Sequence, residues 1–361
     1  MDPRIREQAR VIADHSVDLR PDDDVVVAAP PPAEDLAVAL HEIIGDVGAT
    51  PVTLLGSERA SRAYLRASTE DDFETPAHEL ALVEESDVYV GIRANRNVTE
   101  TGDVDPAIEA ARSKSRRPLL DERLSKRWCL TQFPVPANAQ LAEMSTEAYE
   151  DFVWDAVNKH WDAQRERQDQ MVEILDPADE VRIVSGDTTD VRMSVAGNPT
   201  LNDYGENNLP GGEVFTAPIP DTVTGEVLFD KPLYHQGREV EDVYLRFEDG
   251  RVVEHSAAKN EDVLTAVLDT DPGARRLGEL GIGMNRDIDR FTYNMLFDEK
   301  MGDTVHMAVG RAYDDTVGEG NECNQSAVHV DMIVDMSQDS RIEVDGEVVQ
   351  RDGTLRFEEG F

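Results

Sequence analysis

Residues 24–55, DVVVAAPPPAEDLAVALHEIIGDVGATPVTLL, predict a strand, a helix and a second strand in that order. The run at 24–29 is short and apolar, as is typical of a buried strand, and three prolines follow it. Residues 34–47 place apolar side chains at helical spacing, and Gly48 takes the usual C-terminal glycine position. Residues 50–55 predict the next strand. Such a strand–helix–strand unit predicts parallel strands in a sheet that is covered on both faces.

The same alternation continues on both sides of this unit. Residues 3–16 have a helical apolar pattern, and residues 86–92 predict another strand. No glycine-rich phosphate-binding pattern follows any of these strands, so a scaffold role is more plausible here than nucleotide binding. Residues 145–173 predict one long connector helix, with Ser145 as a candidate N-cap. We therefore expect an α/β scaffold domain over residues 1–180, with a mainly parallel sheet.

After residue 180 the pattern changes to short alternating runs. Four dipeptides typical of hairpin turns separate them: Thr224-Gly225, Asp249-Gly250, Asp345-Gly346 and Asp352-Gly353. A helix is expected at 257–268. Residues 181–361 are therefore expected to form an α+β domain that is dominated by antiparallel sheet.

The chain is strongly acidic throughout. It has 361 residues with 75 Asp plus Glu against 35 Lys plus Arg, a formal net charge of −40. Such a surface repels phosphate backbones and anionic lipid, so we expect neither a nucleic-acid partner nor a membrane partner. No apolar run approaches the ~18 residues that a membrane-spanning helix needs. The two cysteines, Cys129 and Cys323, are too few and too far apart for a disulfide framework.

The dispersed negative charge also bears on the cell that makes the protein. Repulsion of this size is tolerable in concentrated salt, because the Debye screening length is only about 3 Å at 1 M. The polar N-terminus lacks the apolar segment of a signal peptide. We expect a soluble, cytoplasmic protein of a halophile, and an unusually soluble mesophilic protein is the alternative.

Two histidines lie on predicted strands whose opposite face is apolar. In residues 326–335, SAVHVDMIVD, the side chains at 328, 330, 332 and 334 form an apolar face, while His329 and Asp331 share the other. In residues 303–310, DTVHMAVG, His306 shares its face with small residues. Charged groups are seldom buried unless they are paired or bound to metal. Two imidazoles and a carboxylate can form a metal site, and a buried hydrogen-bonded His–Asp pair is the alternative.

Two glutamates lie in apolar, glycine-rich segments, which is unusual for surface acids. Glu213 occurs in PGGEVFTAP (residues 210–218), and Glu279 occurs in LGELGIG (residues 277–283). Glycine in such places often marks close approach of the backbone to a ligand. Both glutamates are therefore candidates for the site that contains the histidines.

Four segments, taken in their order along the chain, resemble the aminopeptidase T (thermophilic metallo-aminopeptidase) family. They are PGGEVFTAP, LGELGIGMN, FDEKMGDTVHMAVGRAY and the HVD strand. The resemblance covers nearly the whole chain and makes residues 181–361 the metal-binding catalytic domain. It implies an exopeptidase with two divalent ions per chain (zinc, cobalt or manganese), and a homodimer that admits short peptides. It places the metal ligands on Glu213, Glu279, His306, Tyr313, His329 and Asp331. Since Tyr313 is seven residues beyond His306, a bulge or turn near Gly310 must redirect it toward the site.

The chemistry of this ligand set agrees with the resemblance. Two divalent ions about 3.5–4 Å apart can hold a metal-bridging water, lower its pKa toward 7 and polarise the scissile carbonyl. We expect Glu279 to bridge the ions and Tyr313 either to ligate one of them or to donate a proton toward the oxyanion. These two are the candidate catalytic residues. Glu299 and Lys300 are close to His306 in sequence but are interpreted equally well as surface charges.

Two other functions remain open at this point. A mononuclear non-haem iron(II) oxygenase would use His306, His329 and one carboxylate, and would leave the other glutamates without a role. A non-catalytic metal- or peptide-binding protein would hold metal without turnover. We favour a metal-dependent aminopeptidase that hydrolyses N-terminal residues from short peptides.

Overall fold

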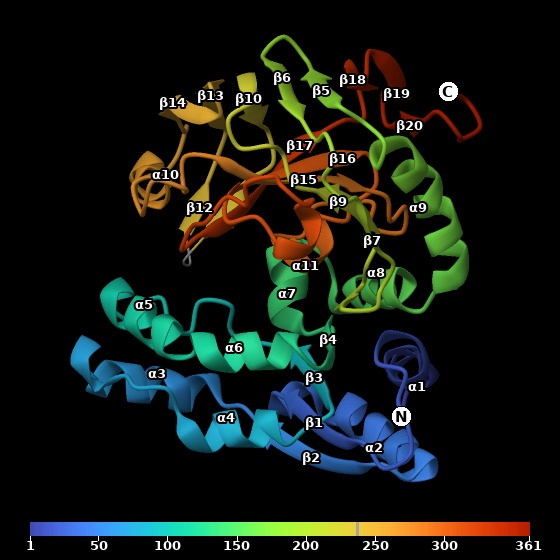
Figure 1. The fold of residues 1–361 in the computed structure, drawn as a ribbon. Coiled ribbons are helices and arrows are strands. Elements are labelled where there is room, and N and C mark those ends of the chain that lie inside the picture. Colours follow the sequence, from blue (N-terminus) through green and yellow to red (C-terminus); the bar gives the residue numbers. More distant parts are fainter. Residues whose placement is uncertain (236–237) are drawn as a thin grey trace. The chain divides into compact units, whose positions relative to one another are not determined.

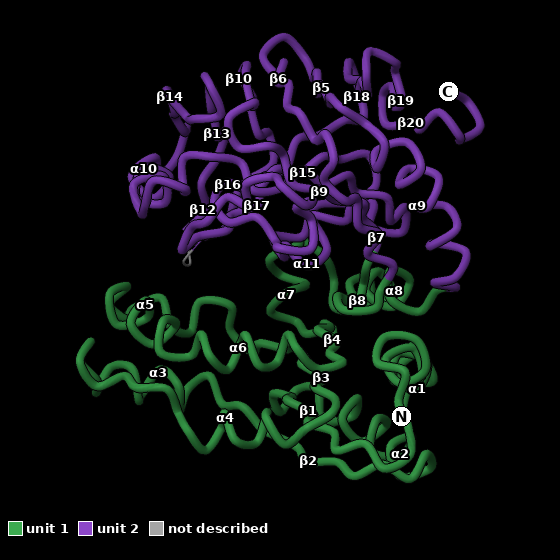
Figure 2. Tube along the Cα trace, in the orientation of Figure 1, with its two compact units in different colours: residues 1–159, 205–211 green, residues 160–204, 212–361 purple. Residues whose placement is uncertain are grey.

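The computed structural model describes residues 1–235 and 238–361, and the chain divides into two compact units. Unit 1 comprises residues 1–159 and 205–211, and unit 2 comprises residues 160–204 and 212–361 (Figure 2). The prediction of one helix over 145–173 is wrong, because α8 (Thr146–Val157) and α9 (Trp161–Leu175) are separate helices. Asn158 ends α8 with φ −89° and ψ 65°, which is not a helical conformation. The boundary between the units therefore lies near residue 159 and not at the expected residue 180.

Unit 1 is built on a parallel sheet, as the sequence predicts. Its strand order is β2-β1-β3-β4-β8, and every neighbouring pair is parallel. The strands are β1 (Asp24–Ala29), β2 (Thr50–Leu55), β3 (Val88–Arg93), β4 (Arg127–Gln132) and β8 (Asn208–Leu209). Between β1 and β2 runs α2 (Glu34–Val47), whose buried stripe includes Leu36, Leu40 and Ile44. The helix ends at Gly48, where φ is 90°, so the predicted glycine cap is confirmed.

The remaining helices of unit 1 are short. They are α1 (Pro3–Arg10), which continues as the π-helix η1 (Val11–Ser16), α3 (Glu58–Ala67), α4 (Ala77–Glu84), α5 (Pro106–Ser115), α6 (Arg117–Leu124), α7 (Pro136–Leu141) and the 3₁₀ turns η2 (Pro31–Ala33) and η3 (Glu70–Asp72) (Figure 1). Within residues 1–235 and 238–361, each helix is too short or too polar to span a membrane.

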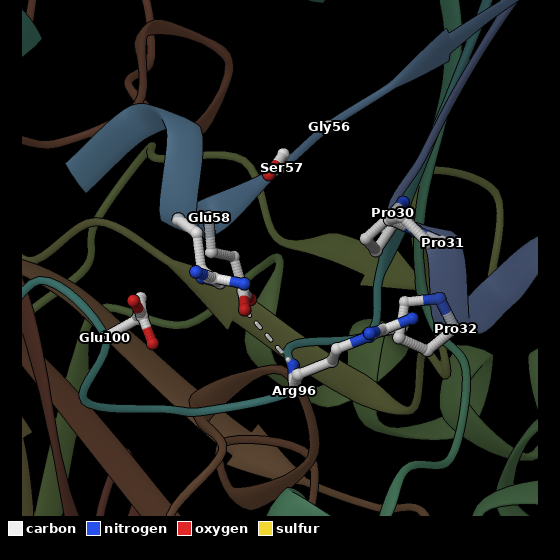
Figure 3. Close-up of a pocket in the computed structure, with 10 residues that line it drawn as sticks. Pro30, Pro31, Pro32, Gly56, Ser57, Glu58, Arg96 and Glu100 are labelled. Carbon is white, nitrogen blue, oxygen red and sulfur yellow. Dashed lines mark hydrogen bonds between the residues drawn. The ribbon is translucent and has the colours of Figure 1, made fainter. Parts of the chain in front are cut away.

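A pocket of about 220 Å³ lies at the carboxyl ends of β1, β2 and β3. Residues 30–32, 56–59, 94, 96 and 100 line it. Figure 3 shows Glu58 in this pocket, with its Oε2 accepting a hydrogen bond of 3.2 Å from the backbone N–H of Arg96. Neither of the two groups of potential metal ligands found among the described residues is in unit 1.

Unit 2 consists of antiparallel sheets, as the sequence predicts. An eight-stranded sheet has the order β14-β13-β10-β6-β5-β18-β19-β20, a five-stranded sheet has the order β17-β16-β15-β9-β7, and β11 pairs with β12. The strands of the larger sheet are β5 (Glu180–Ser185), β6 (Thr189–Ser194), β10 (Thr224–Phe229), β13 (Val243–Glu248), β14 (Arg251–Ser256), β18 (Ser340–Val344), β19 (Glu347–Arg351) and β20 (Thr354–Leu355). The others are β7 (Leu201–Asp203), β9 (Glu213–Thr216), β11 (Leu233–His235), β12 (Arg238–Val240), β15 (Leu277–Gly283), β16 (Thr304–Gly310) and β17 (His329–Asp335). Besides α9, unit 2 has α10 (Glu261–Leu268), α11 (Met295–Asp298) and the 3₁₀ turn η4 (Asp314–Thr316).

Three of the four predicted hairpin turns are confirmed. Asp249-Gly250, Asp345-Gly346 and Asp352-Gly353 each join consecutive strands, and both residues of each pair have positive φ, as a type I′ turn requires. Thr224-Gly225 was wrongly predicted, since it lies inside β10 and pairs with β6. A Cβ on Gly225 would lie 2.1 Å from the carbonyl oxygen of Asp190, so close packing between strands explains this glycine.

The five-stranded sheet has one apolar face, which belongs to the core of unit 2. That face is formed by Val214, Leu280, Ile282, Val305, Met307, Val309, Val330, Met332 and Val334, all buried. The same hydrophobic cluster contains side chains of the eight-stranded sheet, such as Val181, Val191 and Val227. Burial of this apolar surface fixes the register of the strands and leaves their other face for polar side chains.

Candidate metal centre

The polar face of the five-stranded sheet carries the candidate ligands. Side chains alternate along a strand, so Glu279 and Gly281 of β15 share this face with residues of the neighbouring strands that lie opposite them. Asp331 and Glu279 both pair with Ala308, from its two sides, and His306 pairs with Gly281. Glu213 pairs with Gly283, two residues further along β15. Figure 1 shows β9, β15, β16 and β17 next to one another in unit 2, so four adjacent strands build one site.

The ligand atoms form two groups that share Glu279. Glu213, Glu279 and His306 form one group, and Glu279, His329 and Asp331 form the other, with the ligand atoms of each group within 4.8 Å of one another. Nε2 of His306 lies 3.2 Å from Oε2 of Glu213 and 3.1 Å from Oε1 of Glu279. Nε2 of His329 lies 3.4 Å from Oδ1 of Asp331 and 4.0 Å from Oε2 of Glu279. The structure thus brings five of the six predicted ligands together, and Glu279 directs one oxygen to each imidazole.

Several buried polar atoms of this site lack a hydrogen-bond partner among the described residues. They are Oε2 of Glu213, Oε2 of Glu279, Oδ1 of Asp331 and Nδ1 of His306. An unsatisfied buried polar group costs roughly 1–3 kcal/mol, and a charged one costs more. Oxygen and imidazole donors are those that divalent cations such as zinc accept. The residues present therefore fit a centre that binds divalent cations.

Hydrogen bonding also determines which nitrogen of His329 is available. Nδ1 lies 2.8 Å from the backbone carbonyl oxygen of Arg311, to which it donates as N–H. This bond fixes the tautomer and leaves Nε2 of the neutral ring with a lone pair facing the carboxylates. The ring is thus already oriented for metal ligation.

The electrostatics of the site favour positive charge. Burial opposes the charged form of His306, but the hydrogen bond to Glu279 and the charge of Glu213 outweigh it and raise the pKa of His306 to about 9. Burial likewise opposes protonation of His329, and the charge of Asp331 outweighs it and raises the pKa of His329 to about 10. Protons and metal ions thus compete for the same imidazole nitrogens.

Gly281, one of the glycines near Glu279, is required by the position of His306. A Cβ on Gly281 would lie 2.0 Å from Cε1 and 2.1 Å from Nε2 of His306, so the imidazole lies directly against the backbone of β15. The expected close approach to the backbone is therefore present, and the approaching group is a side chain of the site itself. Any other residue at 281 would displace the ring.

We predict that Gly281→Ala weakens zinc binding by about 10–100-fold, because the added methyl group pushes His306 away from Glu213 and Glu279. Overpacking at this position is also expected to lower the free energy of unfolding by about 1–3 kcal/mol. Calorimetric titration with Zn²⁺ and chemical denaturation measure the two effects. Gly45→Ala is the control, since a Cβ there meets nothing within 4 Å. Zinc affinity unchanged in the Gly281 variant would contradict the geometry described for His306.

Tyr313 lies beside the site rather than on one of its strands. The chain leaves β16 at Gly310, whose φ is 104°, a left-handed conformation at the place where a bulge or turn is expected. The ring of Tyr313 is 4.9 Å from the ring of His329 and 6.4 Å from that of Phe215, measured between centroids, and the residue is 48% exposed. Its roles as ligand and as proton donor stay predictions.

Lys300 is a residue for which the sequence left a place near the site and a place on the surface equally open. It is fully buried, and its Nζ lies 3.0 Å from Oε1 of Glu213 and 3.7 Å from Oδ2 of Asp203. It also forms an ion pair with Glu299, whose side chain is 16% exposed. The interpretation of Glu299 and Lys300 as surface charges is therefore wrong. In a chain with so many charged residues, no local pattern distinguishes Glu299 and Lys300 from charged residues on the surface.

Two glutamines of α9 donate hydrogen bonds to the backbone next to the site. Nε2 of Gln168 donates to the carbonyl oxygens of Asp203 and Glu213, at 3.0 and 2.9 Å. Nε2 of Gln164 donates to the carbonyl oxygen of Met284, at 3.1 Å. Both glutamines are buried on the same helix stripe as Trp161, Met171 and Leu175. Their spacing with these apolar residues could have identified them in the sequence.

Comparison with known proteins agrees with this geometry. The chain is similar to Aminopeptidase 2 of Geobacillus stearothermophilus (29% identity over 323 residues, 75% of this chain and 74% of the relative) and to Aminopeptidase T of Thermus aquaticus (40% over 159 residues, 41% and 37%). Among solved structures it is similar to wild-type AmpT from Thermus thermophilus, with a TM-score of 0.87, 25% identity, and coverage of 98% of this chain and 99% of AmpT. A 2,5-dihydroxypyridine dioxygenase from Pseudomonas putida KT2440 shares the fold, with a TM-score of 0.61, 13% identity, and coverage of 98% and 97%.

The model of one family covers almost the entire chain. It describes the thermophilic metalloproteases (M29) and matches residues 1–360, including both units and every candidate ligand. The resemblance in the sequence is thereby confirmed, as is the expectation of a peptide-bond hydrolase. The chain belongs to the thermophilic metalloprotease (M29) family.

Proposed function

We propose that this metalloprotease is an aminopeptidase that removes N-terminal residues from short peptides. The observation that carries the proposal is the convergence of Glu213, Glu279, His306, His329 and Asp331 on one face of a sheet. The relatives named above, which are aminopeptidases, support the restriction to N-terminal residues. In this proposal unit 2 is the catalytic domain and unit 1 is a scaffold.

The centre would hold two divalent ions per chain, of zinc, cobalt or manganese. Glu213 and His306 would bind one ion, His329 and Asp331 the other, and Glu279 would contribute one oxygen to each. When bound, the ions supply a Lewis acid for the scissile carbonyl and lower the pKa of water toward 7. The chain itself orients the ligands from four adjacent strands and holds the ring of His329 through Arg311.

Tyr313, whose ring centroid lies 4.9 Å from that of His329, is the group that would interact with the developing oxyanion. Burial of the site, and then the charges of Glu279 and Asp331, raise the pKa of Tyr313 above its usual range, so its hydroxyl stays protonated. A protonated hydroxyl can donate a hydrogen bond to an oxygen that gains negative charge in the transition state. In this proposal Tyr313 acts there and Glu279 acts as the shared ligand.

A free α-amino group on the substrate is the expected requirement for cleavage. An amine can bind in an acidic site as a ligand or as a cation, whereas an N-acetyl group has neither the charge nor a basic lone pair. We predict release of the first residue from a short peptide with a free N-terminus, and at least about 100-fold slower cleavage of its N-acetylated form. Chromatography of the products measures both. Equal cleavage of the two peptides, or cleavage at internal bonds, would exclude an aminopeptidase.

The remaining parts of the proposal concern the setting in which the enzyme works. We infer a cytoplasmic homodimer in a halophilic cell, on the basis of the net charge of −40 and the family resemblance. We predict that the free energy of unfolding rises with KCl concentration up to molar levels, because screening weakens repulsion between the carboxylates. A parallel denaturation series in sucrose controls for general exclusion effects. Stability that did not increase with KCl would contradict the halophilic origin.

A further inference from the structure

We propose that Lys300 is a positioning residue of the metal centre, which holds Oε1 of Glu213 so that Oε2 is directed toward His306 and Glu279. The inference rests on the proposed function, because it takes Glu213 as a metal ligand. It assigns a role to a fully buried cation that neither the ligand set nor the reaction accounts for.

The position of the ammonium group is determined by carboxylates from three parts of unit 2. Glu213 begins β9, Asp203 ends β7, and Glu299 precedes Lys300 after α11. Nζ lies 3.0 Å from Glu213 and 3.7 Å from Asp203 and forms an ion pair with Glu299. A lysine ammonium has three N–H donors and no acceptor, so it can bond to Glu213 and Glu299, while Asp203 at 3.7 Å contributes only its charge.

The backbone of Lys300 is also fixed. Its N–H donates to the carbonyl oxygen of Phe297, and its own carbonyl oxygen accepts from the N–H of Asn285, both at 3.0 Å. Asn285 lies two residues beyond the end of β15, the strand that carries Glu279. Lys300 is thus tied to the strands that hold two of the candidate ligands.

The two oxygens of Glu213 have different surroundings. Oε1 is bound by Nζ of Lys300, while Oε2 lies 3.2 Å from Nε2 of His306 and has no hydrogen-bond partner among the described residues. Without the ammonium group, the carboxylate could rotate about its last bond or offer both oxygens at once. Lys300 therefore restricts Glu213 to a single donor oxygen aimed at the centre.

A simple charge-balancing role makes the opposite prediction. If Lys300 served only to offset negative charge, its removal would make the site more acidic and strengthen cation binding. If Lys300 orients Glu213, its removal should weaken cation binding although the charge favours it. The sign of the change in zinc affinity therefore distinguishes the two roles.

The test measures Zn²⁺ affinity by calorimetry and the absorption spectrum of the Co²⁺-substituted protein, so it does not depend on activity. We expect Lys300→Met to weaken zinc binding by about 10–100-fold and to change the Co²⁺ spectrum. Glu299→Gln combined with Lys300→Met removes one charge of each sign, and we expect a similar loss. Lys259→Met is the control, since Lys259 pairs with two glutamates on the surface.

A double-mutant comparison shows whether Lys300 acts through Glu213. Adding Lys300→Met to Glu213→Gln should cause no further loss of zinc affinity if the two form one unit. Unchanged or tighter zinc binding in the charge-balanced variant, or additive losses in the double mutant, would overturn the proposal. Either result leaves the proposed function intact as long as the wild-type protein binds zinc and cleaves peptides. Wild-type protein without peptidase activity would refute the proposed function instead.

Discussion

Replacement of Glu279 by glutamine is expected to remove both metal ions and to reduce peptidase activity by about 10³-fold or more, since metal stabilisation of the transition state is worth several kcal/mol. The amide keeps the volume of the side chain but loses the charge and one acceptor oxygen. Glu279 is the residue common to both ligand groups, with Oε1 3.1 Å from His306 and Oε2 4.0 Å from His329. One substitution therefore disturbs both halves of the centre.

Substitutions that affect only one group give the matched comparison. Glu213→Gln should weaken the group that contains His306, and Asp331→Asn the group that contains His329, so each should lose about one equivalent of metal. Glu226→Gln is the control, because Glu226 lies on β10 of the eight-stranded sheet and accepts a hydrogen bond from Tyr244 of β13. Elemental analysis measures the metal content per chain. It should be highest in the control, lower in the two single-group variants and lowest in Glu279→Gln. Equal metal loss in all three site variants would contradict two separate groups, and one ion in the wild type would contradict the two-ion centre.

Much of the site could be predicted because its residues interrupt an otherwise apolar pattern. His306, His329 and Asp331 lie on strands whose other face is entirely apolar, and burial of that face determines the side on which they emerge. Glu213 and Glu279 are flanked by glycines, and Gly281 makes room for His306. In these segments local sequence and tertiary structure impose the same constraint. The period of the apolar residues and the local composition are therefore enough to predict the site residues.

Other features depend on contacts that leave no local trace in the sequence. Lys300 is buried because acids from β7 and β9 surround it, and these acids resemble the many solvated ones. The break at Asn158 occurs inside a continuous helical pattern, so helix propensity alone does not determine where α8 ends. Gly225 resembled a turn residue, but it serves close packing against β6. Such information comes from neighbouring strands and side chains rather than from the segment itself.

The oxygenase alternative requires a redox-active ion, and this difference separates it from peptide hydrolysis. The dioxygenase of Pseudomonas putida has the same fold at 13% identity, and folds of this kind support unrelated reactions. A facial triad of His306, His329 and one carboxylate would also leave Glu213 without a purpose, although Glu213 is buried and directed at His306.

Removal of metal by a chelator is expected to abolish peptidase activity, to below about 1% of the starting rate, because the ligand residues alone supply neither a Lewis acid nor a nucleophile of lowered pKa. Addition of Zn²⁺ or Co²⁺ should restore the activity, and zinc should do so in the absence of oxygen, since zinc has no redox chemistry. The assay follows release of the N-terminal residue from a short peptide in molar KCl, with dialysis against buffer lacking the chelator as the control for handling losses. Full activity of the metal-free protein would refute the hydrolytic centre. Release that required both iron(II) and oxygen would favour the oxygenase, because hydrolysis consumes only water whereas an oxygenase consumes O₂.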